Sequence, residues 1–132
     1  MAKTKIMKDI WVTTKNKVGA LNTMIAGLAE AKVNVWAMCC WTEGENYTTM
    51  MITDNNAKAT ELIKGAGCTT KENEVVVTTL ENKPGTIWDA TQKIKGAGID
   101  IKYLYVTTCG TCPSARIVMC TDNNTKTAEV LG

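Results

Sequence analysis

The chain has 132 residues, of which 45% are hydrophobic, and a formal net charge of +2 at pH 7, so it can bury a core as one domain or two very small ones. The small charge and the lack of a DNA- or RNA-binding motif argue against a nucleic-acid partner. Its start lacks the apolar core of a signal peptide and no stretch reaches membrane-spanning length, so we expect a soluble, cytoplasmic protein.

The first half of the chain predicts the order strand, helix, strand, strand, helix, from runs of β-branched residues and from apolar residues at helical spacing. The expected elements are strands over 6–14, 33–41 and 47–53, helices over 20–31 and 57–66, and a candidate closing strand over 68–71. A turn at 16–19 joins the first strand to the first helix. The Asp-Asn-Asn sequence at 54–56 offers N-cap side chains to the second helix.

The second half repeats this order. "NKVGA" at 16–20 returns as "NKPGT" at 82–86, and Val-Asn-Val at 33–35 returns as Ile-Asp-Ile at 99–101, both 66 positions later. The expected elements are strands over 74–80, 99–108 and 115–120, and helices over 86–98 and 121–131. The chain is therefore one unit written twice, and we predict domains at 1–72 and 73–132.

Helices on one face of an antiparallel sheet define an α+β layered domain, and the order of elements favours a ferredoxin-like βαββαβ unit, repeated twice. The second repeat ends at Gly132 and lacks a last strand of its own. We therefore expect an open sheet edge beside the strand at 75–79. The strand at 33–41 is largely apolar on both faces, which indicates that the second face of the sheet is covered by the other repeat or by a partner subunit, and we favour a homodimer.

The six cysteines are expected to be reduced thiols, because the chain has no secretory signal and enough apolar residues to fold without disulfides. Cys109 and Cys112 form a C-x-x-C pair at a hairpin, a spacing shared by metal knuckles and redox dithiols. A metal needs about four ligands, and the chain has no histidine. Cys39 and Cys40 are adjacent on a strand and point to opposite faces, so they cannot join one site. A tight turn is the plainer interpretation of the pair.

A strand, "NKPG", an amphipathic helix, "GIDI" and a hairpin together resemble the ACT domain, a small ligand-binding module of amino-acid metabolism. The resemblance covers two tandem units, at about 5–71 and 73–132. It implies a βαββαβ fold and amino acids bound at interfaces between units, by the loop after the first strand and a polar residue at the start of the second. The positions that match this pattern are Asn16, Lys17, Gly19, Asn34, Asn82, Pro84, Gly85 and Asp100. Val18 and Asp100 depart from the usual proline and asparagine.

The residues themselves support a site of this kind. Gly19 and Gly85 stand where a strand turns into a helix, so helix-start amides are open to a carboxylate. Asn16 or Asn82 can both donate and accept, and Asp100 can pair with an ammonium group. The same sequences are also ordinary turn chemistry, because glycine permits positive φ and asparagine caps helices.

We thus expect a non-enzymatic regulatory protein that binds an amino acid and signals by a change in subunit geometry. Two alternatives remain: a thiol-based metal or redox sensor at Cys109 and Cys112, and an adaptor that recruits an enzyme or transporter through the open sheet edge. We expect no cofactor, no nucleic acid and no membrane as partners. No P-loop, dinucleotide fingerprint or paired carboxylates indicate an enzyme.

Overall fold

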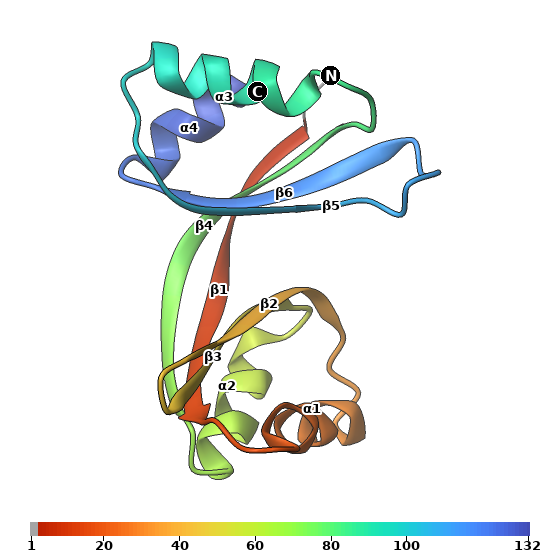
Figure 1. Ribbon diagram of the computed structural model, residues 1–132, viewed down its shortest axis with the longest axis vertical. Coiled ribbons are helices and arrows are strands. Elements are labelled where there is room, and N and C mark those ends of the chain that lie inside the picture. Colours follow the sequence, from red (N-terminus) through yellow and green to blue (C-terminus); the bar gives the residue numbers. More distant parts are fainter. Residues whose placement is uncertain (1–2) are drawn as a thin grey trace. The chain divides into compact units, whose positions relative to one another are not determined.

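The computed structural model describes residues 3–132 (Figure 1). In chain order the elements are β1 (Lys3–Lys15), α1 (Ala20–Glu30), β2 (Val35–Glu43), β3 (Asn46–Thr53), α2 (Asn56–Gly65), β4 (Thr69–Glu81), α3 (Thr86–Gly96), β5 (Ile101–Thr107), β6 (Ser114–Thr121) and α4 (Asn124–Leu131). The predicted α+β fold, with its repeated order of strands and helices, is confirmed.

The chain divides into two compact units, and the division does not follow the sequence order. We call residues 8–73 the first unit, and residues 74–132 together with the N-terminal segment through residue 7 the second unit. Strands β1 and β4 therefore each contribute one part to each unit. The predicted boundary after residue 72 falls within β4, whose sequence has no glycine or proline to end the strand.

In the first unit the sheet order is β2-β3-β1-β4, the order of a ferredoxin-like domain. The pairings of β1 with β3 and of β2 with β3 are antiparallel, with Ile10 opposite Met51 and Met38 opposite Met51. Helices α1 and α2 cover one face, where their buried side chains form the core with Ile10, Val12 and Met51. The core arises because each helix presents apolar residues at helical spacing to alternate strand residues.

In the second unit the order is β1-β4-β6-β5, which is the same arrangement. The last strand of this unit is provided by residues 3–7, at the start of the chain. The hydroxyl oxygens of Thr4 and Thr78 lie 2.8 Å apart, and Thr78 is fully buried. The second repeat does lack a closing strand of its own, as predicted. The expectation of an open edge beside residues 75–79 is wrong, because the N-terminal segment pairs there.

The two Asp-Asn-Asn sequences do more than cap the helices. Asn55 and Asn123 accept hydrogen bonds from the backbone amides of Lys58 and Lys126, as N-caps. The next asparagine ties three elements together. Asn124 accepts from the amide and hydroxyl of Thr121 and donates to the carbonyl of Glu74, and Asn56 repeats this with Thr53 and Lys8. Each of these two asparagines therefore joins a helix start to the end of one strand and to a residue of another strand.

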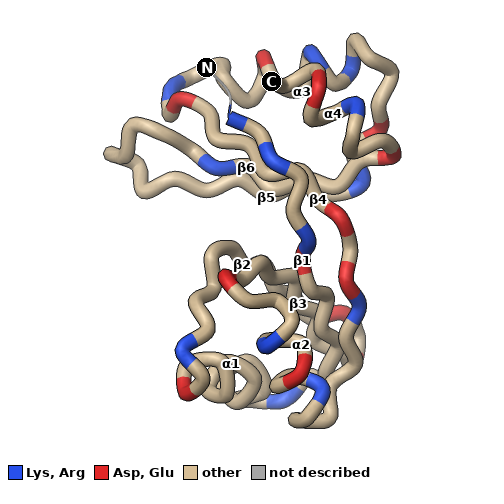
Figure 2. The backbone as a smooth tube through the Cα atoms, turned by 180° about the vertical axis from the view of Figure 1, so that it is seen from behind, with Lys and Arg blue, Asp and Glu red and all other residues tan. Residues whose placement is uncertain are grey.

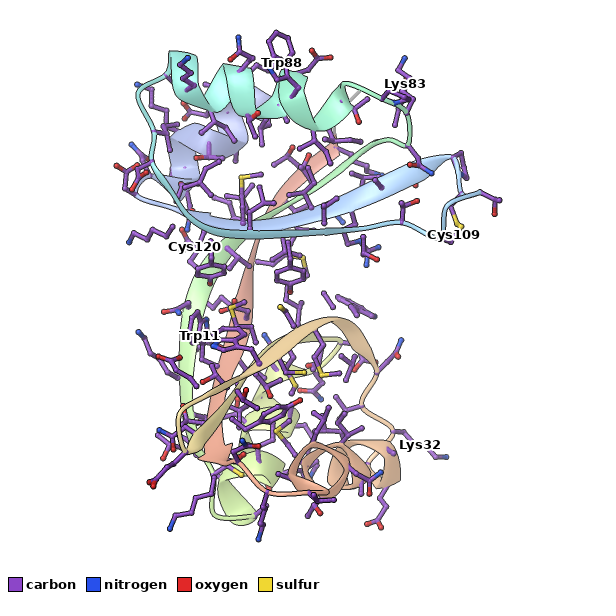
Figure 3. The ribbon with its side chains drawn as sticks, in the orientation of Figure 1. Trp11, Lys32, Lys83, Trp88, Cys109 and Cys120 are labelled. Atoms are coloured by element: carbon purple, nitrogen blue, oxygen red, sulfur yellow. A yellow bond between two sulfur atoms is a disulfide. The ribbon has the colours of Figure 1, made fainter. Side chains whose placement is uncertain are left out.

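The second face of each sheet is also apolar. In the first unit this face includes Trp11 (Figure 3) and Trp41, whose rings meet edge to face with centroids 5.9 Å apart. Met50 and Ile52, on the same face, are buried. In the second unit Tyr103 and Tyr105 stand opposite Cys120 and Val118. The apolar second face that was predicted from the strand at 33–41 is therefore present in the first unit.

Charged residues are interspersed along both units (Figure 2). Over residues 3–132, no helix has the length and apolar character needed to cross a membrane.

Candidate functional site

Both glycine turns have the same backbone conformation. Gly19 and Gly85 have φ values of 85° and 93°, in the left-handed region, and they are the N-cap residues of α1 and α3. No side chain caps either helix start. A Cβ atom at either glycine would meet no heavy atom within 4 Å, so glycine is required here by the backbone angle rather than by space.

A shallow hollow lies beside each glycine turn, and the two hollows are equivalent. Each is bounded by the end of the unit's first strand, by the helix after the glycine, and by the end of the unit's second helix or the turn that follows it. The first hollow, of about 280 Å³, is lined by Thr14, Lys15, Lys17, Ala20, Thr23, Met24, Ala66, Gly67 and Cys68. The second, of about 230 Å³, is lined by Leu80, Glu81, Lys83, Thr86, Asp89, Ala90, Lys93 and Leu131. Each of the first six residues in the first set lies 66 positions before the residue at the same place in the second set.

The two hollows differ in charge. Lys15 and Lys17 line the first hollow, and none of its described lining residues is a carboxylate. In the second hollow the Lys83 ammonium lies 2.6 Å from a Glu81 carboxylate oxygen, and Asp89 is a second carboxylate. The hydrogen bond from Lys83 lowers the pKa of Glu81, and the same bond raises the pKa of Lys83. Lys83 therefore forms an ion pair at the exposed surface of the second hollow.

The turn of the second unit is held by more hydrogen bonds than that of the first. The hydroxyl of Thr86 donates to the carbonyls of Glu81 and Lys83, at 2.9 and 3.1 Å. The Asn82 side-chain nitrogen donates to the carbonyls of Gly110 and Cys112, at 3.3 and 2.8 Å. The side-chain amide of Asn82 therefore donates its hydrogen bonds to the loop of the β5–β6 hairpin.

The structure places Asn34 and Asp100 far from the glycine turn of their own unit. The backbone of Asn34 exchanges hydrogen bonds with Asp54, and that of Asp100 with Asp122, both just before the second helix of the unit. The eleven residues of α1 span about 16 Å, and this helix separates Gly19 at its start from Asn34 beyond its end. Asn16, Lys17 and Gly19 lie together, as do Asn82, Pro84 and Gly85, but neither group meets the polar residue of its own unit.

Cys109 and Cys112 form a disulfide, with Cα atoms 5.5 Å apart. The expectation of six reduced thiols is therefore wrong for this pair, because the tight hairpin loop brings the two Cβ atoms within bridging reach. Cys39, Cys40, Cys68 and Cys120 are free. Among residues 3–132, no group of three or more cysteine, aspartate or glutamate side chains is placed to hold a metal ion.

Sequence reasoning missed the residues that complete each hollow. Thr86 has a local signal, since it is a hydroxyl residue directly after the N-cap glycine. Ala66–Cys68 and Leu131 have none, because they come from the turn after α2 and from the end of α4, and they reach the hollow only through tertiary packing.

The comparisons with known proteins agree with this fold. The family model described as an ACT domain pair matches residues 5–131. Among curated proteins no match was found. A crystal structure of a protein from Bacteroides thetaiotaomicron has a TM-score of 0.89 at 23% identity, over 97% of this chain and 88% of that chain.

Two further similar structures are regulatory subunits of aspartate kinase. The subunit from Thermus thermophilus, in a ligand-free form, has a TM-score of 0.70 at 12% identity, over 97% of this chain and 93% of that chain. The subunit from Thermus flavus has a TM-score of 0.68 at 11% identity, over 98% and 91%. At these identities the likeness is one of fold alone. The match of the family model over nearly the whole chain shows that this protein belongs to the family of ACT domain pairs.

Proposed function

We propose that this protein is a non-enzymatic regulator that binds a small amino acid at its glycine turns and passes the signal on through a change in subunit geometry. The observation that carries this proposal is the pair of equivalent hollows, each beside an uncapped helix start, in a chain of the ACT domain pair family. Regulatory subunits with a similar fold support the class of function.

The carboxylate of the ligand fits the first hollow better than the second. The first-turn amides of α1 have no side-chain cap and no acidic residue near them, and Lys15 and Lys17 line the same hollow. The first turn of α3 contains Asp89, and the charge of Lys83 is paired with the carboxylate of Glu81. An anion is attracted to amides and cations and repelled by carboxylates, so the first hollow is the stronger anion site.

The ammonium group needs a partner from outside the unit that holds the carboxylate. A small amino acid cannot reach from Gly19 to Asn34, or from Gly85 to Asp100, across the length of a helix. In the proposed complex, a second copy of the chain presents Asn34 or Asp100 to the ligand. A ligand shared between copies favours the geometry in which both sets of contacts form, and this gives a route to an enzyme or transporter partner in the cytoplasm.

A screen of the common amino acids by thermal unfolding tests this proposal. One or a few ligands should raise the unfolding midpoint, since a ligand at 100 times its Kd adds about 2.7 kcal/mol of stability. Lys17→Gln should weaken binding several-fold, and Lys83→Gln, the matched change in the second unit, should have little effect. Asp100→Asn distinguishes a charged from a neutral contact to the ammonium group. A flat midpoint for every amino acid would refute the proposal.

A further inference from the structure

The Cys109–Cys112 disulfide lies at the tip of the β5–β6 hairpin (Figure 3). Every residue from 107 to 114 is exposed, whereas the four free cysteines are buried or half-buried. Beside the disulfide is a hollow of about 370 Å³, lined by both cysteines, Arg116 and the hydroxyl residues Thr79, Thr107, Thr108 and Ser114. A small thiol in solution can therefore approach both sulfur atoms.

Three hydrogen bonds join this hairpin tip to the glycine turn of the same unit, and all three come from Asn82. Its side-chain nitrogen donates to the carbonyls of Gly110 and Cys112, and its backbone amide donates to the carbonyl of Pro113 at 3.0 Å. Asn82 is three residues before Gly85, the N-cap of α3. The conformation of the cystine loop and that of the turn are thus directly connected.

The first unit provides an internal control. The loop between β2 and β3 is shorter and has no cysteine, and it meets the turn through one backbone bond, from the amide of Asn16 to the carbonyl of Glu45 at 2.8 Å. Within the described residues, the side chain of Asn16 makes no bond like those of Asn82. The cystine and its side-chain link are additions to the second unit alone.

We propose that Cys109 and Cys112 form a redox-active dithiol–disulfide site whose state sets the order of the 82–85 turn. In reduction, the thiolate of a small dithiol attacks one sulfur, the Cys109–Cys112 bond breaks, and a mixed disulfide forms. The second thiolate of the reductant then displaces the cysteine. Two electrons and two protons pass from the dithiol to the protein, leaving two thiols and an oxidised, cyclic reductant. A small disulfide reverses the reaction.

Reduction acts on the turn through conformational freedom. The disulfide closes a ring over four residues and so holds the carbonyls of Gly110 and Cys112 in place for Asn82. Once the ring opens, ordering those carbonyls costs more entropy, and their bonds to Asn82 weaken. For the role of the turn in ligand binding this inference rests on the proposed function, but the redox step and its effect on the turn do not.

Amide hydrogen exchange measured by NMR, without any amino-acid ligand, tests the inference. Adding dithiothreitol to the oxidised protein should speed exchange of the backbone amide of Asn82 about 3- to 10-fold. This is the effect of losing one modest hydrogen bond. The matched Asn16 amide should not change. The double variant Cys109→Ser with Cys112→Ser should exchange at the reduced rate with or without dithiothreitol. Asn82→Asp removes the two side-chain bonds and keeps the backbone bond to Pro113, so it should reduce the redox response at residue 82 well below that of wild type.

Several outcomes would overturn the inference. These are free thiols at Cys109 and Cys112 in the air-oxidised protein, an unchanged Asn82 amide on reduction, or an equal change at Asn16. A response that persists in full in Asn82→Asp would also do so. Because no ligand is present, failure of the amino-acid screen leaves this result standing, and the reverse is also true.

Discussion

The pairing of the N-terminal segment with β4 can be tested with one pair of threonines. The hydroxyls of Thr4 and Thr78 lie 2.8 Å apart, and Thr78 is fully buried. Thr4→Val keeps the shape of the side chain and removes the hydroxyl. The hydroxyl of Thr78 then loses this partner in a place that water does not reach.

The magnitude follows from the cost of leaving a buried polar group without its partner. That cost is about 1–2 kcal/mol for a neutral hydroxyl, so Thr4→Val should lower the free energy of unfolding by that amount. Thr78→Val leaves only the half-buried hydroxyl of Thr4 without its partner and should cost less, because water can reach that group. The double variant removes both hydroxyls and should lie within about 0.5 kcal/mol of wild type, because two methyl groups of the same shape replace the pair. In a domain of this size, 1 kcal/mol corresponds to about 3 °C in the unfolding midpoint.

Urea unfolding of the four proteins measures these energies, and hydrogen exchange locates them. The loss in Thr4→Val should appear in amides of the second unit, including β4 beyond residue 74. Thr13→Val, an exposed threonine on the same strand but in the first unit, serves as the control and should change little. A neutral Thr4→Val, or two single losses that simply add in the double variant, would refute the pairing.

Three further predictions concern single positions. Lys32, with φ of 59°, is the one non-glycine residue in the left-handed region among those described, and the equivalent position of the second repeat is Gly98. Lys32→Gly should therefore raise the free energy of unfolding by roughly 0.5–1 kcal/mol in urea. A lower free energy of unfolding would contradict this prediction. Asn124→Ala removes three hydrogen bonds, to Thr121 and Glu74, and should lower the free energy of unfolding by about 2–3 kcal/mol in the same assay. A loss below about 0.5 kcal/mol would contradict the role of these bonds in joining the helix start to the strands. The Glu81–Lys83 pair stabilises the fold only while both groups are charged. Because the pKa of Glu81 is lowered in the fold, its contribution is lost as the pH falls through that pKa. Because the pKa of Lys83 is raised, its contribution is lost as the pH rises through the pKa of Lys83. Thermal midpoints of wild type and Lys83→Gln should therefore differ slightly at neutral pH and converge in acid and in alkali, whereas a gap that does not vary with pH would exclude the ion pair as its cause.

Local patterns predicted the elements well because their causes are local. Helical spacing of apolar residues located α1 and α3, and the Asp-Asn-Asn sequences located the starts of α2 and α4. The glycine turns were predicted from a repeated five-residue phrase, and both glycines have the positive φ that such turns require. The cystine was not predicted, since whether two thiols can bridge depends on the distance between their Cβ atoms in the folded loop.

The sequence by itself determined that this protein is one α+β unit written twice, with a glycine-started helix in each copy. It did so because periodicity, capping and turn chemistry act over a few residues. Only the tertiary structure decided which strand completes the second unit, which residues close each hollow, and that Asn82 is tied to the cystine loop. Those outcomes depend on contacts between residues 28 to 74 positions apart, where pairing is chosen by the packing of the whole unit rather than by any local preference.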